Sequence, residues 1–179
     1  MKRNFTKFLL PPMFFLLAFV YQTAKAQWNT NTSVNLQISG LPTADMQAVP
    51  TTDNKLWVAF YHENAGNYDM RAQLFDAEGN KLLGPDGVLV SNQPSGSATF
   101  VFNVCTDASN NLIVGTQDQR SGGLQAYVYK ISQSGAHLWS SSGVLLGSGL
   151  APYPAGLPNG EVVVSWDSDL ANTLSLQKI

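Results

Sequence analysis

The sequence repeats itself at a spacing of 56 residues, and this repeat limits the folds that the chain can adopt. Three stretches match in one register without a gap: 56–60 falls on 112–116, 76–83 on 132–139, and 87–90 on 143–146. A third, shorter copy begins near 162–166 and ends at 175–179. Repeats of this length are typical of architectures in which similar units pack one on the next. We expect such units at approximately 47–91, 99–147 and 151–179.

Each copy divides into short apolar strands bounded by turn-forming residues, and no stretch after residue 26 keeps a helical period. The expected strands are 47–51, 55–61, 69–76 and 88–91 in the first copy, 99–106, 111–117, 125–132 and 144–146 in the second, and 152–157, 161–167 and 173–179 in the third. The third copy thus lacks a fourth strand. Near the N-terminus, Trp28 followed by 34–38 resembles Trp139 followed by 144–146. We therefore expect segment 28–38 to complete the last sheet.

Sets of four antiparallel strands at this spacing are typical of β-propeller blades. The second strand of the first and third copies is apolar at consecutive positions, as expected where both faces of a sheet are covered. The aligned residues Ala59, Gly115 and Ser165 are small, which predicts close approach between neighbouring sheets. The sequence therefore predicts an all-β fold of about three four-stranded antiparallel β-propeller-type blades over 27–179.

The number of blades leaves three alternatives. Propellers typically have four to eight blades, whereas this sequence carries about three copies of the repeat. The chain is an incomplete propeller truncated at the C-terminus, or half of a dimeric six-bladed one, or its sheets pack as a sandwich. We expect truncation, because Ile179 ends a predicted strand and no turn follows it.

A turn signal separates the third and fourth strands. Asp76 and Gly79 stand there in the first copy, and Ser132 and Gly135 in the second. The spacing differs from the Ser-x-Asp-x-Gly-x-x-Trp hairpin of sialidase-like propellers. We interpret it as a turn in which the Asp or Ser side chain accepts backbone hydrogen bonds and glycine adopts a positive φ.

Segment 69–83 has the pattern D-x-x-A-Q-x-x-D followed by x-x-G-N, and Gly87 and Val88 follow it. This pattern resembles the repeat of secreted bacterial β-propeller-like proteins, which are common among cargo of the Bacteroidetes type IX secretion route. Trp139 keeps the Leu-Trp pair of that repeat, whereas Leu83 departs from it. The resemblance implies a propeller-like fold and an exported protein, and it implies no particular activity.

Residues 1–26 have the pattern of a secretory signal peptide. A basic start precedes an apolar stretch at 8–21, and Ala24-Lys25-Ala26 is a small-x-small cleavage signal. The apolar stretch has about fourteen residues, fewer than the roughly twenty that cross a bilayer. We expect cleavage after Ala26, no membrane span in the mature chain, and a location outside the cell or at its surface.

The charge balance argues against a nucleic-acid partner. Four of the ten basic residues lie within 1–26, so six remain against twelve acidic residues, a net charge of about −6. Phosphate backbones are bound by clustered Lys and Arg. Cys105 is the single cysteine and lies in an apolar strand, so we expect a buried thiol there; an intermolecular disulfide or reactive thiol is the alternative.

The loop after the second strand is polar in every copy, at 62–64, 118–120 and 167–169. If the copies surround an axis, these loops gather at one end. Carboxylates there could bind a cation or sugar hydroxyls, and Arg120 an anionic group. The alternative is that these residues only begin solvated turns. The candidate ligand-binding residues are Glu63, Asp118, Arg120, Asp167, Asp169, Tyr61 and Trp166.

Aromatic side chains near these loops offer faces for sugar stacking, or belong to the core. Tyr61, Tyr68 and Trp166 lie at strand ends beside the loops, whereas Trp57 and Trp139 are predicted core residues. His62 and His137 form no HExxH pair, and no calcium motif supports Ca²⁺, so no metal or other cofactor is predicted.

The sequence leads to a secreted, non-enzymatic β-propeller-like binding or structural module. Its expected partner is a glycan or a cell-surface protein, and a homodimer is expected if the chain is complete. No catalytic residue is assigned. The alternative is the N-terminal fragment of a propeller-fold glycoside hydrolase, sialidase-like or related, with Glu63, Asp118 or Asp167 among its carboxylates.

Overall fold

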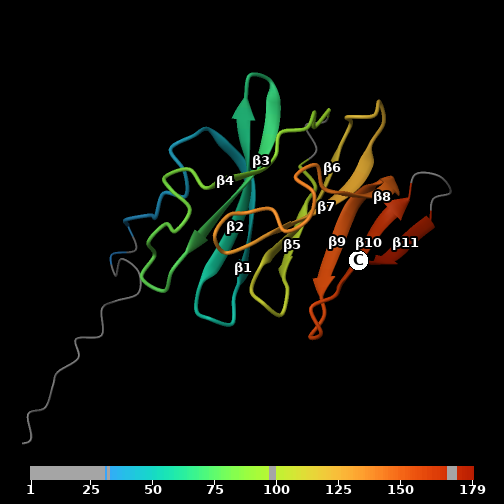
Figure 1. Ribbon diagram of the computed structural model, residues 1–179. Helices are drawn as coiled ribbons and strands as arrows, with labels where there is room; N and C mark the ends of the chain where they lie inside the picture. Colours follow the sequence, from blue (N-terminus) through green and yellow to red (C-terminus); the bar gives the residue numbers. More distant parts are fainter. Residues whose placement is uncertain (1–30, 32, 97–99, 169–172) are drawn as a thin grey trace, which may run out of the picture.

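The computed structural model describes residue 31 and residues 33–96, 100–168 and 173–179. Within these residues the protein is all-β, with eleven strands and no helix. The strands form three antiparallel sheets, which stand side by side in chain order from left to right in Figure 1. In the part of the chain described, no helix is long and apolar enough to cross a membrane.

Each sheet is an up-and-down meander of neighbouring strands. The first sheet contains β1 (Thr43–Pro50), β2 (Leu56–Asn64), β3 (Asn67–Phe75) and β4 (Val88–Ser91). The second contains β5 (Asn103–Thr106), β6 (Leu112–Asp118), β7 (Gln125–Ile131) and β8 (Val144–Ser148). The third contains β9 (Leu150–Gly156), β10 (Val162–Ser168) and β11 (Thr173–Lys178). The eleven strands expected within the three copies are thus confirmed, with bounds that shift by a few residues.

The twelfth expected strand is wrong. Residues 34–38 are not a strand and do not pair with β11; Trp28 lies outside the described residues. Ile38 instead packs beside Val58 and Phe60 on the face of the first sheet that looks away from the second. Just after it, the backbone N of Gly40 donates to Asp86 Oδ1 at 2.8 Å. The segment stays with the first sheet because Ile38 covers apolar surface there.

The sheets pack through the alternating faces of their strands. Trp57, Ala59 and Tyr61 of β2 face Leu112 and Val114 of β6 in one buried cluster. A second cluster joins the opposite face of the second sheet to the third, with members that include Ile113, Val128, Val162, Val164 and Trp166. The first strands also lie in series, β1 against β5 and β5 against β9. This series is the propeller-like arrangement expected from the repeat.

The small residue Gly115 marks a close approach between two sheets. A Cβ added there would lie 2.7 Å from the carbonyl oxygen of Pro152 in β9. Its counterpart Ala59 is fully buried between the first and second sheets. Ser165 occupies the same position in β10, but on the face of the third sheet that looks away from the second. The expectation of close packing holds for the two interior interfaces.

Aspartate and serine side chains close the turns as expected. Asp76 Oδ1 accepts hydrogen bonds from the backbone N of Glu78 at 3.0 Å and of Asn80 at 2.7 Å. In the second copy Ser132 Oγ accepts from the backbone N of Ala136 at 3.0 Å. Gly79 and Gly135 have φ values of 83° and 84°, in the region that favours glycine. These turns hold the end of β3 and of β7 beside the residues that follow each turn, with Phe75 opposite Lys81 and Ile131 opposite His137.

Asp107 closes the β5–β6 turn in the same way and carries an ion pair. Its Oδ1 accepts from the backbone N of Ser109 and of Asn111, and its Oδ2 lies 2.7 Å from Lys130 Nζ on β7. Burial alone would raise the pKa of Asp107, but the hydrogen bonds from Lys130 and Asn111 outweigh it and lower that pKa below its ordinary value. The carboxylate therefore stabilises the folded state.

We expect Gly115→Ala to lower the free energy of unfolding by about 1–3 kcal/mol, because the new methyl group would meet the backbone of β9. Urea denaturation measures this difference. Gly123→Ala is the matched control, since a Cβ there meets nothing within 4 Å. Equal stability of the two variants would contradict the close approach.

We expect Asp107→Asn to flatten the loss of stability in acid. A carboxylate with a lowered folded-state pKa stabilises the protein above its unfolded pKa of about 3.9, and this contribution is lost as the pH falls through the folded value. Urea midpoints between pH 7 and pH 2 should fall less for the variant than for the unchanged protein. Parallel profiles would show that Asp107 does not contribute.

Candidate functional site

Two of the three polar loops lie at the same end of the molecule. The β2–β3 turn and the β6–β7 loop both project beyond the sheets at the top of Figure 1. In the third loop, Asp167 and Ser168 form the end of β10, and Asp169 lies outside the described residues. The end of β4 and the link from β4 to β5 pass through this same end and place Ser91, Gln93 and Ser95 between the first and second sheets.

The two aromatic candidates Tyr61 and Trp166 are buried. Tyr61 OH lies 3.0 Å from Thr116 Oγ1 across the interface of the first and second sheets, and its ring meets Phe102 edge-on at 5.2 Å. Burial raises the pKa of Tyr61 to about 12, although the bond to Thr116 opposes this shift. Trp166 packs in the cluster between the second and third sheets. Both side chains hold sheets together in this structure.

The carboxylate candidates do not share one surface. Strand alternation places Glu63 on the same face of β2 as Tyr61, toward the second sheet, and it is exposed at the strand end. Asp118 ends β6 on the facing surface and is buried. Asp167 is exposed on the face of β10 that looks away from the second sheet. Glu63 and Asp118 therefore belong to the interface of the first and second sheets, whereas Asp167 lies on the outer face of the third sheet.

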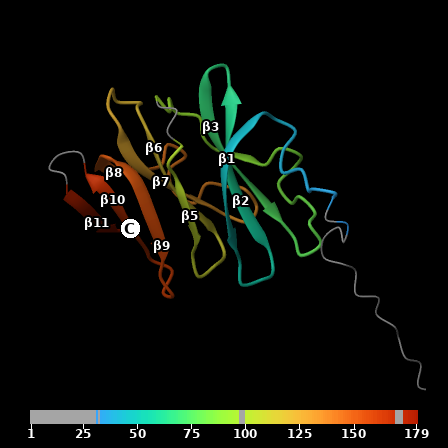
Figure 2. The same ribbon diagram turned by 180° about the vertical axis from the view of Figure 1, so that it is seen from behind.

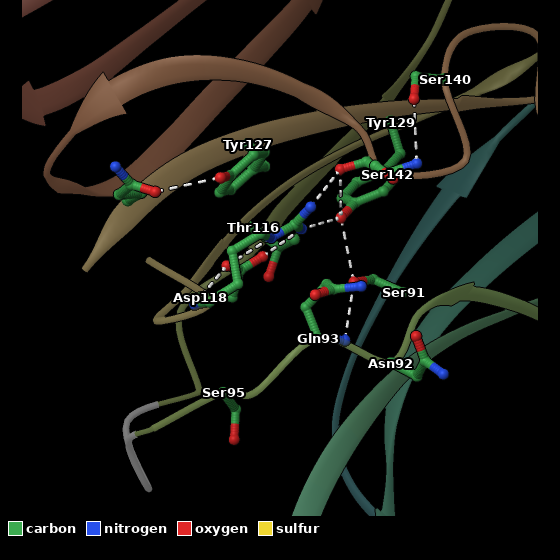
Figure 3. Close-up of polar contacts among 12 residues, drawn as sticks. Ser91, Asn92, Gln93, Ser95, Thr116, Asp118, Tyr127, Tyr129, Ser140 and Ser142 are labelled. Carbon is green, nitrogen blue, oxygen red and sulfur yellow. Dashed lines mark hydrogen bonds and ion pairs between the residues drawn. The ribbon is translucent and has the colours of Figure 1, made fainter. Parts of the chain in front are cut away.

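Asp118 and Arg120 form an ion pair at the centre of a polar cluster. Arg120 Nε donates to Asp118 Oδ1 at 2.9 Å, and Nη2 donates to Oδ2 at 2.5 Å. Nη2 also donates to Tyr129 OH at 2.7 Å, and Nη1 donates to the carbonyl of Ser142 at 2.6 Å. The guanidinium lies over the ring of Tyr127, with Cζ 3.8 Å from the ring centroid. Figure 3 shows this cluster joining β6, β7 and the β4–β5 link.

The charge of Arg120 is compensated within the fold. Burial works against the charged guanidinium, but the hydrogen bonds to Asp118 and Tyr129 outweigh it and raise the pKa of Arg120. Burial also disfavours the charged form of Tyr129 and therefore raises the pKa of its hydroxyl. This hydroxyl donates to Ser91 Oγ at 3.0 Å. The ion pair thus ties the β6–β7 loop to β7 and to the end of β4.

Two cavities open beside these residues. The smaller one, lined in part by Tyr61, Thr116 and Asp118, has about 10 Å³ of free volume, the room for about one water molecule. The larger is a hollow of about 690 Å³ between the β2–β3 turn and the β4–β5 link. We call it the end hollow. It is lined by Ala65, Gly66, Asn67, Tyr68, Pro94, Ser95 and Gly96.

The walls of the end hollow are fixed by a buried carboxylate. Asp69 accepts from Asn64 Nδ2 at 2.8 Å and from Asn67 Nδ2 at 3.0 Å, across the β2–β3 turn. Asn67 Oδ1 in turn accepts from the backbone N of Ser95 at 3.0 Å, which attaches the opposite wall. The ring of Tyr68 meets Phe100 edge-on at 4.6 Å. The hollow is therefore preorganised by side chains that line it or lie just beneath it.

In the described ranges, no group of three or more His, Cys, Asp or Glu residues could hold a metal ion. Cys105 is partly buried, and burial raises the pKa of its thiol to about 11.

The sequence did not predict the residues that surround the Asp118–Arg120 ion pair or those that fix the walls of the end hollow. Tyr129, Ser142 and Ser91 come from three separate segments, and nothing in their sequence context indicates that they meet Arg120. The turn 64–67 carries a recognisable signal in Asn64, Gly66 and Asn67. Ser95 has none, because it reaches the hollow through the path of the β4–β5 link.

Comparison with known proteins finds structural similarity at low sequence identity. No family model and no curated protein matches the sequence. The NanB sialidase from Streptococcus pneumoniae is similar in structure, with 14% identity and a TM-score of 0.42 over 80% of this chain and 23% of that one. The endo-arabinase from Bacteroides thetaiotaomicron VPI-5482 has 12% identity and a TM-score of 0.39 over 79% of this chain and 57% of that one. The chain thus spans less than two thirds of either structure.

We expect Arg120→Gln to lower the free energy of unfolding by roughly 3–5 kcal/mol, because it leaves the buried Asp118 carboxylate without its partner. Asp118→Asn combined with Arg120→Gln should recover part of this loss. Urea denaturation at pH 7 measures both. Lys178→Gln, which breaks an exposed ion pair with Glu161, serves as control and should change the midpoint far less. Similar losses in the two single variants would contradict a structural role for Arg120.

Proposed function

We propose that this chain is a secreted, non-enzymatic propeller-like module that binds a neutral glycan at the end hollow. The observation that carries this proposal is the lining of the hollow. Its volume lies within the roughly 300–1,000 Å³ of small-molecule sites. It offers one aromatic side chain, a serine hydroxyl and loop backbone, and none of its lining residues is charged.

This lining suits a sugar. Apolar faces of sugar rings pack on aromatic side chains such as Tyr68, while sugar hydroxyl groups exchange hydrogen bonds with hydroxyl and backbone groups. Tyr68 and Asn67 are held by Phe100 and Asp69, so little order has to be created on binding. Glu63 is exposed at the end of β2, near the turn that forms one wall, and is the carboxylate we retain as a ligand contact.

A glycoside hydrolase is the second candidate function. It needs two carboxylates on either side of a glycosidic bond, about 5–10 Å apart. We place it second because Asp118 is engaged by Arg120 and Asp167 lies on a different sheet face from Glu63. Arg120 as a site for an anionic ligand is ranked lower for the same reason: its charge already has a partner.

The test is binding of the full chain to an immobilised panel of neutral and acidic glycans, with released sugar measured in parallel. We expect retention of a neutral glycan without turnover. Tyr68→Ala should weaken retention at least tenfold, because the stacking face is lost. Tyr153→Ala is the matched control, since Tyr153 is an exposed tyrosine on the third sheet, away from the hollow.

Thermal melting of both variants checks that each is folded. Released sugar that disappears in Glu63→Gln or Asp167→Asn would favour the hydrolase instead. Retention that is equal in Tyr68→Ala and Tyr153→Ala would rule out the end hollow as the binding site. If the chain neither retains a glycan nor releases sugar, a structural role is the function that is left.

A further inference from the structure

The smaller cavity, of about 10 Å³, lies inside the interface of the first and second sheets. These two sheets stand next to each other in both views of the molecule (Figures 1 and 2). The lining includes Tyr61 from β2, Ser91 from the end of β4, and Thr116 and Asp118 from β6. Tyr61, Thr116 and Asp118 are each at most 5% exposed, so their polar groups are removed from bulk water.

One hydroxyl hydrogen at this cavity needs an acceptor. Tyr61 OH and Thr116 Oγ1 lie 3.0 Å apart and share a hydrogen bond in which either can be the donor. Each hydroxyl carries one hydrogen, so this bond uses only one of the two. Among the described residues, neither hydroxyl bonds to another partner. Since a buried polar hydrogen without an acceptor is costly, the second hydrogen calls for an acceptor within the cavity.

Asp118 has an acceptor site to spare at the same cavity. A carboxylate offers about four lone-pair sites, two on each oxygen. Oδ1 accepts from the backbone N of Arg120 at 3.2 Å and from its Nε at 2.9 Å. Within the described part of the chain, Oδ2 accepts from Arg120 Nη2 alone. One acceptor site on Oδ2 therefore stays open on a buried charged group.

Ser91 supplies a further donor. Its Oγ accepts from Tyr129 OH at 3.0 Å and from the backbone N of Gln93 at 3.3 Å. Both lone pairs of the Ser91 hydroxyl are thus occupied, and its own hydrogen is left to donate. Figure 3 shows Ser91 in the same polar region as Thr116 and Asp118.

We propose that this cavity binds one water molecule, which bridges the first and second sheets. The water accepts from the remaining hydrogen of the Tyr61–Thr116 pair and from Ser91, and it donates to Asp118 Oδ2. Buried waters typically make about three hydrogen bonds to groups that otherwise lack partners, and one water needs a cavity of about this size. A cation is the poorer occupant, because Arg120 already compensates the charge of Asp118.

The water site adjoins the end hollow. Tyr68 and Ser95 line both cavities, so the water lies on the inner side of two residues that form the hollow. Its occupancy does not depend on a glycan, because each of its hydrogen-bond partners belongs to the interface between the sheets. The site is therefore independent of the proposed function.

The test compares the full chain with a double variant that lacks both hydroxyl groups, Tyr61→Phe with Thr116→Val. Each substitution removes a hydroxyl and keeps a side chain of similar shape. Tyr127→Phe is the matched control, because Tyr127 is 6% exposed and its hydroxyl donates to Gln125 Oε1. Neither of these two residues lines the cavity. Oxygen-17 magnetic relaxation dispersion of the solvent counts the long-lived water molecules of each protein.

We expect the unchanged chain and Tyr127→Phe to hold equal numbers of long-lived waters, and the double variant to hold one fewer. A high-resolution crystal structure of the unchanged chain should show this water within about 3.2 Å of Asp118 Oδ2 and of one of the two hydroxyl oxygens.

Equal numbers of long-lived waters in all three proteins would overturn the proposal. A crystal structure of the unchanged chain with no ordered water in this cavity would overturn it as well. Thermal melting shows whether the double variant is folded, and if it is not, the crystal structure of the unchanged chain decides.

Discussion

The structure depends on burial of both faces of the second sheet. Ile113 and Val128 pack toward the third sheet, while Leu112, Val114 and Tyr129 pack toward the first. Each large apolar side chain removed from water in this way contributes about 1.5–3 kcal/mol. A single four-stranded sheet would leave both of these faces in water. Stacking of successive sheets is therefore the condition for the other features of the fold.

The polar features at the loop end follow from this stacking. Two sheets that meet face to face leave their strand ends side by side, and the connections must satisfy backbone and side-chain polar groups there. Arg120 and Asp118 do so for the β6–β7 loop, and Asp69 does so for the β2–β3 turn. The first arrangement leaves room for about one water molecule, whereas the second supports an open hollow. This difference is why we associate binding with Tyr68 and the end hollow rather than with Arg120.

The repeat predicts a fourth strand in the third sheet, and the structure places the segment expected to form it elsewhere. β4 and β8 are the fourth strands of the first and second sheets, whereas no described strand takes that place beside β11 in the third. The segment expected to fill that place, 34–38, lies against the first sheet, where Ile38 covers Val58 and Phe60. One short segment cannot serve both surfaces, and the nearer apolar face holds it. Leu174 and Leu176 of β11 are exposed for a different reason: they lie on the face of the third sheet that looks away from the second.

The sequence by itself determined the elements. Repeated apolar runs and turn residues such as Asp76 and Gly79 predict eleven strands in three sets, because strand formation and turn closure depend on neighbouring residues. Tertiary structure decided which residues meet. It buried Tyr61, Trp166 and Asp118, separated Asp167 from Glu63, and brought Ser95 to Asn67. These outcomes depend on how sheets stack and on where connections cross the loop end, and contacts between segments far apart in the chain leave no local pattern in the sequence.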